Sequence, residues 1–462
     1  MTRKLSLFSL VMLIVTAIDS IRNLPSAALF GSALIFFFIA AALVFLIPTS
    51  LVAAELTAIF PEKGGVYHWV DRAFGDKWAM VAIWMQWINT MVWYPTILSF
   101  IAGTAAYLIN PDLVDHKGYL LGCILTVFWA ITFLNFFGLH FSSKINNIFG
   151  MVGTIFPMVL LIILGGVWIF LDKPLQIKVD AGTLIPSFTD SRNWISLIAI
   201  MASFLGMELA GVHVNDIKEP QKNFPKALFI SAFFILATMV LGSLAIAFVV
   251  PGEKINLVSG VMQVLSGFFQ AFHLGWLTPV LAVLIVIGSI GSIINWLISP
   301  AKGLLHAAEF GYLPLFFTKK NSKDVPCRIL LAQAILVSLF CLVYLLVPSV
   351  NGFYWFLTAL STGLYMIMYI LMFASALKLH HKYRDRPKVF KIPGGSLGIW
   401  FVCMLGFIGC LSTIVVSFFP PGNIEIGSNI RYIAMVGIAN VLTISPVFLF
   451  YCHKRRNKTK LL

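Results

Sequence analysis

Apolar segments long enough to cross a lipid bilayer recur along the whole chain, and polar residues interrupt the first of them. A transmembrane helix needs about 20 predominantly apolar residues. About twelve such segments are centred near residues 16, 43, 92, 129, 158, 203, 237, 288, 338, 365, 408 and 441. Only 11% of the residues are charged, whereas soluble domains carry about 25%. The sequence therefore predicts an all-α membrane protein with about twelve transmembrane helices.

Lysine and arginine are distributed unevenly between the predicted loops. If both termini are cytoplasmic, most of the 32 basic residues fall in cytoplasmic segments. Because this bias follows the positive-inside rule, we expect a multi-pass plasma-membrane protein with both ends inside and a retained first helix. The formal net charge of +14 then reflects topology and attraction to anionic lipid headgroups, and no nucleic acid is expected as a partner.

The loops between the predicted spans are short and leave no room for a soluble catalytic domain. The six cysteines have no metal-ligand spacing. The sequence also has no nucleophile and base pairing, no HExxH and no cofactor motif. We therefore expect a protein that is not an enzyme, has no catalytic residues, metal or cofactor, and acts within the membrane.

The stretch TAIDSIRNLPSA, residues 16–27, places charged groups inside the first span. A lone charge at the centre of a transmembrane helix costs about 2.5–3.5 kcal/mol, and a proline disfavours helical geometry at the residue before it. We expect an interruption between Ile18 and Leu24, with Asn23 as the N-cap of a second half-helix. Free N–H groups at such an end, with Arg22 beside them, would bind a carboxylate.

A second interruption is expected in the sixth span, at SFLGMELAG, residues 203–211. Its glycines weaken the helix, and Glu208 is another ionisable group at membrane depth. Two interrupted spans separated by five are typical of inverted repeats with a binding site between them. The expected division is a first five-helix repeat over 1–172, a second, inverted repeat over 193–378, two peripheral helices over 396–452 and a short basic cytoplasmic tail over 453–462.

The ionisable groups at both interruptions also have structural interpretations. Asp19 and Arg22 are three residues apart, so they can neutralise each other on one helix face. Glu208 can accept hydrogen bonds from backbone N–H groups that the second interruption frees. The sequence leaves these alternatives open beside substrate binding and proton coupling.

Motifs spread over nearly the whole chain resemble the amino acid/polyamine/organocation transporter superfamily. They are FPEKGGVYHWVDRAFGDKW, SFLGMELAGVHVNDIKEPQKNFPKAL, VPGEKINLVSGVMQVL, NWLISPAKGLLHAAEFGYLP and VFKIPGG. The nearest likeness is to bacterial glutamate/GABA antiporters. This resemblance implies a LeuT-like fold in a bacterial inner membrane that exchanges small amino acid substrates by alternating access. The sequence leaves the oligomeric state open, a homodimer included.

The resemblance assigns the two ends of a substrate to the two interruptions. The segment from Ser20 to Asn23 would line the carboxylate end, and backbone carbonyls around Ala202 to Leu205 would accept the ammonium. The bulky DSIRN departs from the small-residue break common in the superfamily, so a charge there can contact substrate directly. The predicted substrate-binding residues are Asp19, Ser20, Ile21, Arg22, Asn23, Ala202, Ser203, Phe204, Leu205, Trp296 and Tyr365.

Aromatic residues at membrane depth provide candidates for gates. Trp93 and Tyr94 of the third span can stack on a substrate or gate it, but they can also be core packing. By the resemblance, Trp296 falls where related exchangers place an aromatic ring against the substrate, although tryptophan is also a common interfacial anchor. Tyr365 and Tyr369 are one helical turn apart and can bind substrate, bind Glu208 or simply pack.

One histidine, His213, lies just below the sixth span and is a candidate pH sensor, because imidazole titrates near neutrality. It can equally be an ordinary interfacial residue. The predicted gating or proton-coupling residues are Glu208, Trp93, Tyr94 and His213. Related antiporters can carry a long carboxy-terminal plug, whereas only CHKRRNKTKLL follows the last span here, so plug-type pH gating is not expected.

These observations favour a secondary amino acid antiporter. A proton-coupled amino acid symporter, with Glu208 or Asp19 taking up the proton, is the alternative within transport. A membrane amino acid sensor is the alternative from another class. The sequence identifies neither the amino acid carried nor the coupling.

Overall fold

The computed structural model describes residues 6–60, 65–137, 148–186, 191–208, 219–383, 390–420, 424–425 and 427–459. Within these ranges every regular element is helical. The elements up to residue 186 are α1 (Leu7–Ile18), η1 (Ile21–Asn23), α2 (Leu24–Ala28), η2 (Gly31–Ala33), α3 (Leu34–Ala41), η3 (Ala42–Leu46), α4 (Ile47–Ile59), α5 (Val66–Phe74), α6 (Asp76–Ala106), η4 (Pro111–Asp115), α7 (Lys117–Phe136), η5 (Met151–Ile155), α9 (Phe156–Phe170) and α10 (Ala181–Leu184). Those that follow are α11 (Ser191–Ala202), α12 (Pro220–Val249), η7 (Gly252–Lys254), α13 (Gly260–Ala271), α14 (Leu277–Glu309), η8 (Leu315–Thr318), α15 (Cys327–Cys341), η9 (Leu342–Leu345), α16 (Val350–Lys382), α17 (Gly395–Val416), α18 (Asn429–Ile444) and α19 (Pro446–Thr459).

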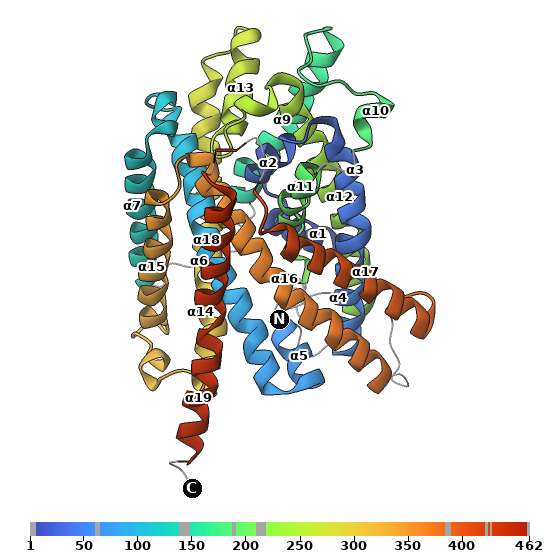
Figure 1. Ribbon diagram of the computed structural model, residues 1–462, viewed down its shortest axis with the longest axis vertical. Helices are drawn as coiled ribbons and strands as arrows, with labels where there is room; N and C mark the ends of the chain where they lie inside the picture. Colours follow the sequence, from blue (N-terminus) through green and yellow to red (C-terminus); the bar gives the residue numbers. More distant parts are fainter. Residues whose placement is uncertain are drawn as a thin grey trace.

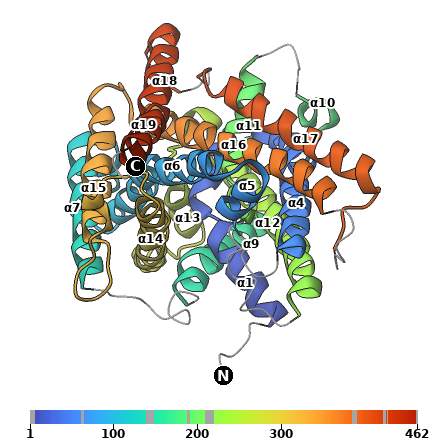
Figure 2. The same ribbon diagram turned by 90° about the horizontal axis from the view of Figure 1, so that it is seen from below.

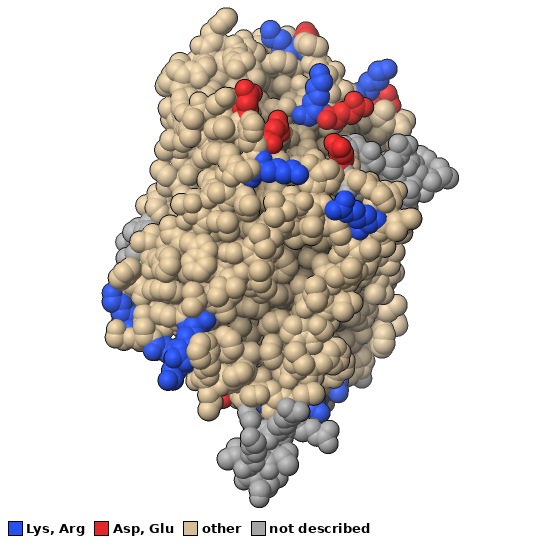
Figure 3. All heavy atoms as spheres, turned by 60° about the vertical axis from the view of Figure 1, so that its left-hand side comes forward, with Lys and Arg blue, Asp and Glu red and all other residues tan. Residues whose placement is uncertain are grey.

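The described part of the chain contains 10 helices that are long and apolar enough to cross a membrane. On the face drawn in Figure 3, charged side chains gather toward the two ends of the molecule, and a broad band between them shows none. This pattern confirms the predicted multi-pass helical membrane protein. The two further spans expected near residues 92 and 203 lie on α6 and α11, so a total of twelve stays a prediction.

Several long helices, among them α7, α14, α15 and α18, run along the long axis of the molecule, whereas α16 and α17 cross it obliquely (Figure 1). Helix α16 packs against α6 and α17, and α14 also packs against α6. Seen from below in Figure 2, α7 and α15 form one edge of the molecule, as they do in Figure 1. Helix α16 is largely buried, and Tyr354, Trp355 and Tyr369 are among its buried side chains. Arg22, in the interrupted first helix, donates to Thr96 of α6 and to Tyr354 of α16, so these two helices lie beside the interruption.

The first interruption lies where the sequence predicts it. Helix α1 ends at Ile18, and Asp19 and Ser20 are extended, with ψ values of 116° and 106°. The helical run resumes at Ile21 as the 3-10 turn η1 and continues into α2. Asn23 occupies the N-cap position of α2, but the expectation of a side-chain cap is wrong, because its side chain makes no capping bond. The helical run already begins at Ile21 in η1, one turn before α2, so backbone hydrogen bonds form at this point without a side-chain cap.

The second interruption begins after Ala202, where α11 ends and turns occupy residues 203–206. Gly206 has φ +106°, a conformation that residues with a Cβ rarely adopt. The glycine is therefore required for this path of the chain. The predicted weakening at residues 203–211 is confirmed up to Glu208, and the rest of that stretch, like His213, lies outside the described residues.

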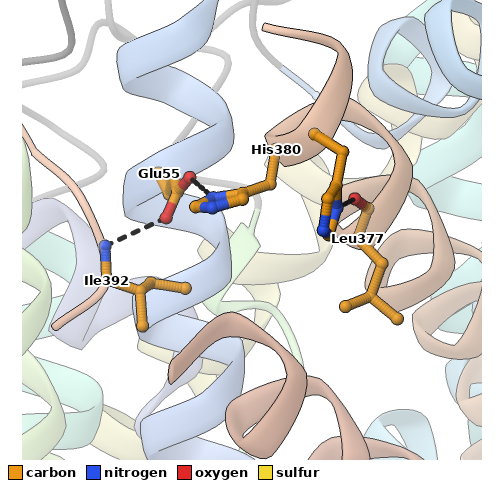
Figure 4. Close-up of polar contacts among 5 residues, drawn as sticks. Glu55, Leu377, His380 and Ile392 are labelled. Atoms are coloured by element: carbon orange, nitrogen blue, oxygen red, sulfur yellow. Dashed lines mark hydrogen bonds and ion pairs between the residues drawn. The ribbon is translucent and has the colours of Figure 1, made fainter. Parts of the chain in front are cut away.

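A buried polar cluster joins α4 to the end of α16 and to the segment before α17 (Figure 4). Oε1 of Glu55 lies 2.5 Å from Nδ1 of His380. Oε2 of the same carboxylate accepts the backbone N–H of Ile392 at 2.9 Å. Both Glu55 and His380 are buried. One side chain of α4 thus holds two segments from the other end of the sequence.

Replacement of Glu55 with alanine is expected to destabilise the protein by about 2–6 kcal/mol, because two buried polar groups are left unpaired and each costs about 1–3 kcal/mol. The Ile392 N–H and the His380 ring would both lose their acceptor. Thermal unfolding in detergent measures the effect. Replacement of the exposed Glu253 with alanine is the control, and equal stability of the two variants would contradict a stabilising role of the cluster.

Candidate functional site

Both interruptions open onto one cavity of about 110 Å³. A single buried water needs about 10–15 Å³, so the cavity has room for a larger ligand. Helices α6, α14 and α16 and the short η5 contribute the rest of its wall. Of the predicted substrate-binding residues, those that line the cavity are Asp19, Ser20, Ile21, Arg22, Asn23, Ala202, Leu205, Trp296 and Tyr365.

Two of the predicted residues, Ser203 and Phe204, have side chains directed elsewhere. The Ser203 hydroxyl donates to the carbonyl of Ala199 at 3.0 Å. Phe204 is buried and packs edge-on against Phe38, with 5.8 Å between ring centroids. Their side chains do not line the cavity, because successive residues of a turn point in different directions. A role for the backbone carbonyls of this turn stays a prediction.

Arg22 is a buried cation at the cavity wall. Its Nη1 donates to Thr96 at 2.9 Å and to the hydroxyl of Tyr354 at 3.4 Å. Its guanidinium carbon lies 5.0 Å from the ring centroid of Trp93, within the range of a cation–π contact. Its Nε is buried and has no hydrogen-bond partner in the described part of the chain. All these contacts are with neutral groups, so the positive charge has no compensating carboxylate among the described residues.

Asp19 is equally buried and has a different partner. The hydroxyl of Thr238, on α12, donates to Oδ2 of Asp19 at 2.9 Å. Oδ1 of Asp19 is buried without a partner in the described ranges. No ion pair joins Asp19 to Arg22 within those ranges. The two charges therefore do not neutralise each other, and the interpretation of them as an internal ion pair does not describe this structure.

Glu208 is the last described residue of the second interruption, and two tyrosines of α16 hold its carboxylate. The hydroxyl of Tyr365 donates to Oε1 of Glu208 at 2.6 Å, and the hydroxyl of Tyr369 donates to Oε2. Tyr369 also accepts the N–H of Gly206 at 2.9 Å, and Tyr365 accepts from the amide of Gln86 at 3.2 Å. This network ties the turn after α11 to α16 and α6. The alternative in which the tyrosines bind Glu208 is the one that the geometry supports.

The aromatic candidates divide into a cavity wall and its support. The ring centroids of Trp93 and Trp296 lie 5.9 Å apart, and both residues line the cavity. Tyr94 does not line it, because its hydroxyl donates to the carbonyl of Trp296 at 2.9 Å and its ring packs on Phe128. Trp93 therefore faces the cavity, whereas Tyr94 fixes the position of α14. His213, the remaining gating candidate, lies outside the described residues.

Sequence reasoning missed several polar residues of the site. Thr96 and Tyr354 hold Arg22, Thr238 holds Asp19, and Ser361 donates to the amide oxygen of Asn89. Single hydroxyls are common in apolar helices, where they hydrogen-bond to the preceding turn. A threonine, serine or tyrosine in such a helix therefore does not by itself indicate a binding site. Glu55 was also missed, although a glutamate in an apolar span is a detectable signal.

Comparison with known proteins identifies the family. The family model described as "Amino acid permease" matches residues 5–440. An uncharacterized transporter of Legionella pneumophila is 44% identical over 91% of this chain and 91% of that protein. A glutamate/gamma-aminobutyrate antiporter of Lactococcus lactis is 27% identical over 98% and 92%, respectively. A probable agmatine/putrescine antiporter of the same species is 25% identical over 87% and 84%.

These matches cover nearly the whole chain, and the relatives carry the names of transporters of small molecules. They agree with a helical membrane protein whose interrupted helices meet at an internal cavity. The chain therefore belongs to the amino acid permease family, in the amino acid/polyamine/organocation superfamily, and is a membrane transporter similar to the glutamate/GABA antiporters.

Proposed function

We propose that this chain is a secondary amino acid antiporter that works by alternating access. The observation that carries the proposal is Arg22, a buried cation on the cavity wall with no carboxylate partner among the described residues. A guanidinium in this position suits a substrate carboxylate, which it can bind through charge-assisted hydrogen bonds. The names of two relatives as antiporters support exchange as the mode of transport.

In the proposed complex the substrate lies between the two interruptions. Its carboxylate binds Arg22 and the N–H groups at the start of the second half of the first helix. Its ammonium lies between Asp19 and the turn after α11, both of which line the cavity, and backbone carbonyls around Ala202 to Leu205 would accept its N–H groups. The rings of Trp93 and Trp296 and the hydroxyl of Tyr365 surround the side chain, and this arrangement would exclude water from the bound substrate.

The proposed transport cycle alternates the side of the membrane to which the cavity opens. Residues 1–172 and 193–378 act as two inverted five-helix repeats, with 396–452 as peripheral helices and 453–462 as a cytoplasmic tail. Both termini face the cytoplasm of a bacterial cell, beside anionic lipid headgroups. An empty carrier reorients slowly, which enforces exchange. A homodimer is compatible with this cycle.

Counterflow in proteoliposomes tests the proposal. Vesicles with purified protein are loaded with one unlabelled amino acid per preparation, and the entry of labelled glutamate, GABA, glutamine, leucine and arginine is followed. We expect labelled substrate to accumulate only when an amino acid is present inside, because the loaded carrier reorients faster than the empty one. Vesicles without protein, and vesicles loaded with buffer alone, are the controls.

Two outcomes would contradict antiport. Uptake into buffer-loaded vesicles driven by a pH gradient would establish the proton-coupled symporter instead. Binding of amino acids to the purified protein, with no transport in any preparation, would favour the sensor. Both outcomes are distinguishable from exchange in the same set of vesicles.

A further inference from the structure

We propose that the cavity selects amino acids of net charge zero and rejects substrates that carry a third charge. The inference rests on the proposed function and names the substrate class of that same site. It separates this chain from relatives whose names state exchange of glutamate or exchange of agmatine and putrescine.

An acidic and a basic side chain, Asp19 and Arg22, line the cavity without pairing to each other. Arg22 is bound by Thr96, Tyr354 and the face of Trp93, and all three are uncharged. Asp19 receives one hydrogen bond from a threonine hydroxyl, and its second carboxylate oxygen is buried without a partner in the described part of the chain. A buried charge is costly unless it is paired and hydrogen-bonded. A ligand with one positive and one negative group is therefore electrostatically complementary to this site.

A zwitterionic amino acid meets this requirement on both sides. Its carboxylate compensates Arg22, and its ammonium compensates Asp19. A diamine fits poorly, because it has no carboxylate for Arg22 and brings a second cation beside the guanidinium. Substrates without a carboxylate are therefore excluded by the same charge that attracts amino acids.

The rest of the wall determines which side chains are accepted. Among its described residues, Asp19 and Arg22 are the only acidic and basic ones. The neutral polar groups on the wall include the amide of Asn89 and the hydroxyls of Thr358, Ser361 and Thr362. A glutamate carboxylate or a lysine ammonium would meet only such dipoles after losing its water, whereas a neutral polar side chain can hydrogen-bond to them.

Isosteric substrate pairs provide the test on the unmodified protein. Exchange rates are measured in proteoliposomes at pH 7 for glutamine against glutamate and for asparagine against aspartate, with serine, lysine and putrescine alongside. Glutamate and aspartate then carry a net charge of −1. We expect the neutral member of each pair to exchange at least about tenfold faster at equal subsaturating concentration, a difference of about 1.4 kcal/mol. Lysine and putrescine should exchange as poorly as the acidic members.

The results distinguish the two proposals. Exchange that favours glutamate, aspartate, lysine or putrescine would overturn the charge selection and leave antiport standing. Absence of exchange for every compound would overturn the proposed function, and the substrate class with it.

The variant Asp19→Asn tests the residue itself. It keeps the size of the side chain and an oxygen for Thr238, but it leaves the cavity with a net positive charge. We expect the preference for the neutral member of each pair to fall at least about tenfold, because the acidic member then compensates the excess charge. A purely structural role would slow both members equally, and an unchanged ratio would overturn the assignment of Asp19. The exposed Asp112, replaced with asparagine, is the matched control and should keep the ratio.

Discussion

Replacement of Arg22 with alanine is expected to weaken the binding of every carboxylate-bearing substrate by at least about 30-fold. Loss of one partner of a buried, hydrogen-bonded charge pair costs about 2–5 kcal/mol, and the lower value already corresponds to that factor. Arg22 lines the cavity, and its charge has no other acidic partner in the described ranges. Ligand-dependent thermal stabilisation of the purified protein measures the affinity, and counterflow measures the accompanying loss of exchange.

Two further variants separate charge from packing. Arg22→Lys keeps a positive charge but cannot bind a carboxylate through two parallel N–H groups, so we expect it to recover only part of the affinity. Arg431 is exposed, and its guanidinium donates to the carbonyl of Leu346, so Arg431→Ala should bind substrate normally. Normal affinity in a poorly folding Arg22→Ala protein would instead assign Arg22 to holding α6 and α16 together.

The interruption of the first helix could be predicted because its causes are local. A proline, two charges and an asparagine within one apolar segment are incompatible with an exposed continuous helix, and the chain does break at Asp19 and Ser20. The break after Ala202 was predictable for a similar reason, since glycine marks a position where the backbone can turn. These predictions depend on a few neighbouring residues.

The partners of Asp19 and Arg22 could not be predicted in the same way. The rule that residues three apart face each other assumes a continuous helix, whereas Asp19 and Ser20 are extended. This extended backbone sends Asp19 toward Thr238 of α12 and Arg22 toward Thr96 of α6. Each partner comes from a distant part of the sequence, and its hydroxyl looks like many others in apolar helices.

The network around Glu208 combines a local feature with a long-range one. Gly206 sets the backbone path that brings Glu208 to α16, and Tyr369 receives the Gly206 N–H while donating to the carboxylate. Tyr365 lines the cavity and also donates to Glu208. One side chain therefore contacts both the cavity and the turn after α11, so movement of α16 relative to this turn would alter both.

Replacement of Glu208 with alanine is expected to lower the rate of exchange at least about tenfold while substrate affinity changes less than about threefold. Two buried tyrosine hydroxyls would lose their acceptor, and each such loss costs about 1–3 kcal/mol. Because Glu208 itself does not line the cavity, its loss destabilises the contact between α16 and the turn after α11 rather than the bound substrate. The measurement is the exchange rate at saturating substrate beside the affinity from ligand-dependent thermal stabilisation.

Three companion variants identify the property of Glu208 that matters. Glu208→Gln keeps an acceptor but cannot titrate, so a changed pH dependence of exchange would establish proton uptake by Glu208, and an unchanged one would leave a structural hydrogen-bonding role. Tyr369→Phe removes one donor to the carboxylate, along with the acceptor for the Gly206 N–H, and we expect an intermediate loss of rate. The exposed Glu253, replaced with glutamine, should behave as the unmodified protein. An exchange rate unaffected by Glu208→Ala would show that the contact does not limit the cycle, because the two hydroxyls would then be satisfied in some other way.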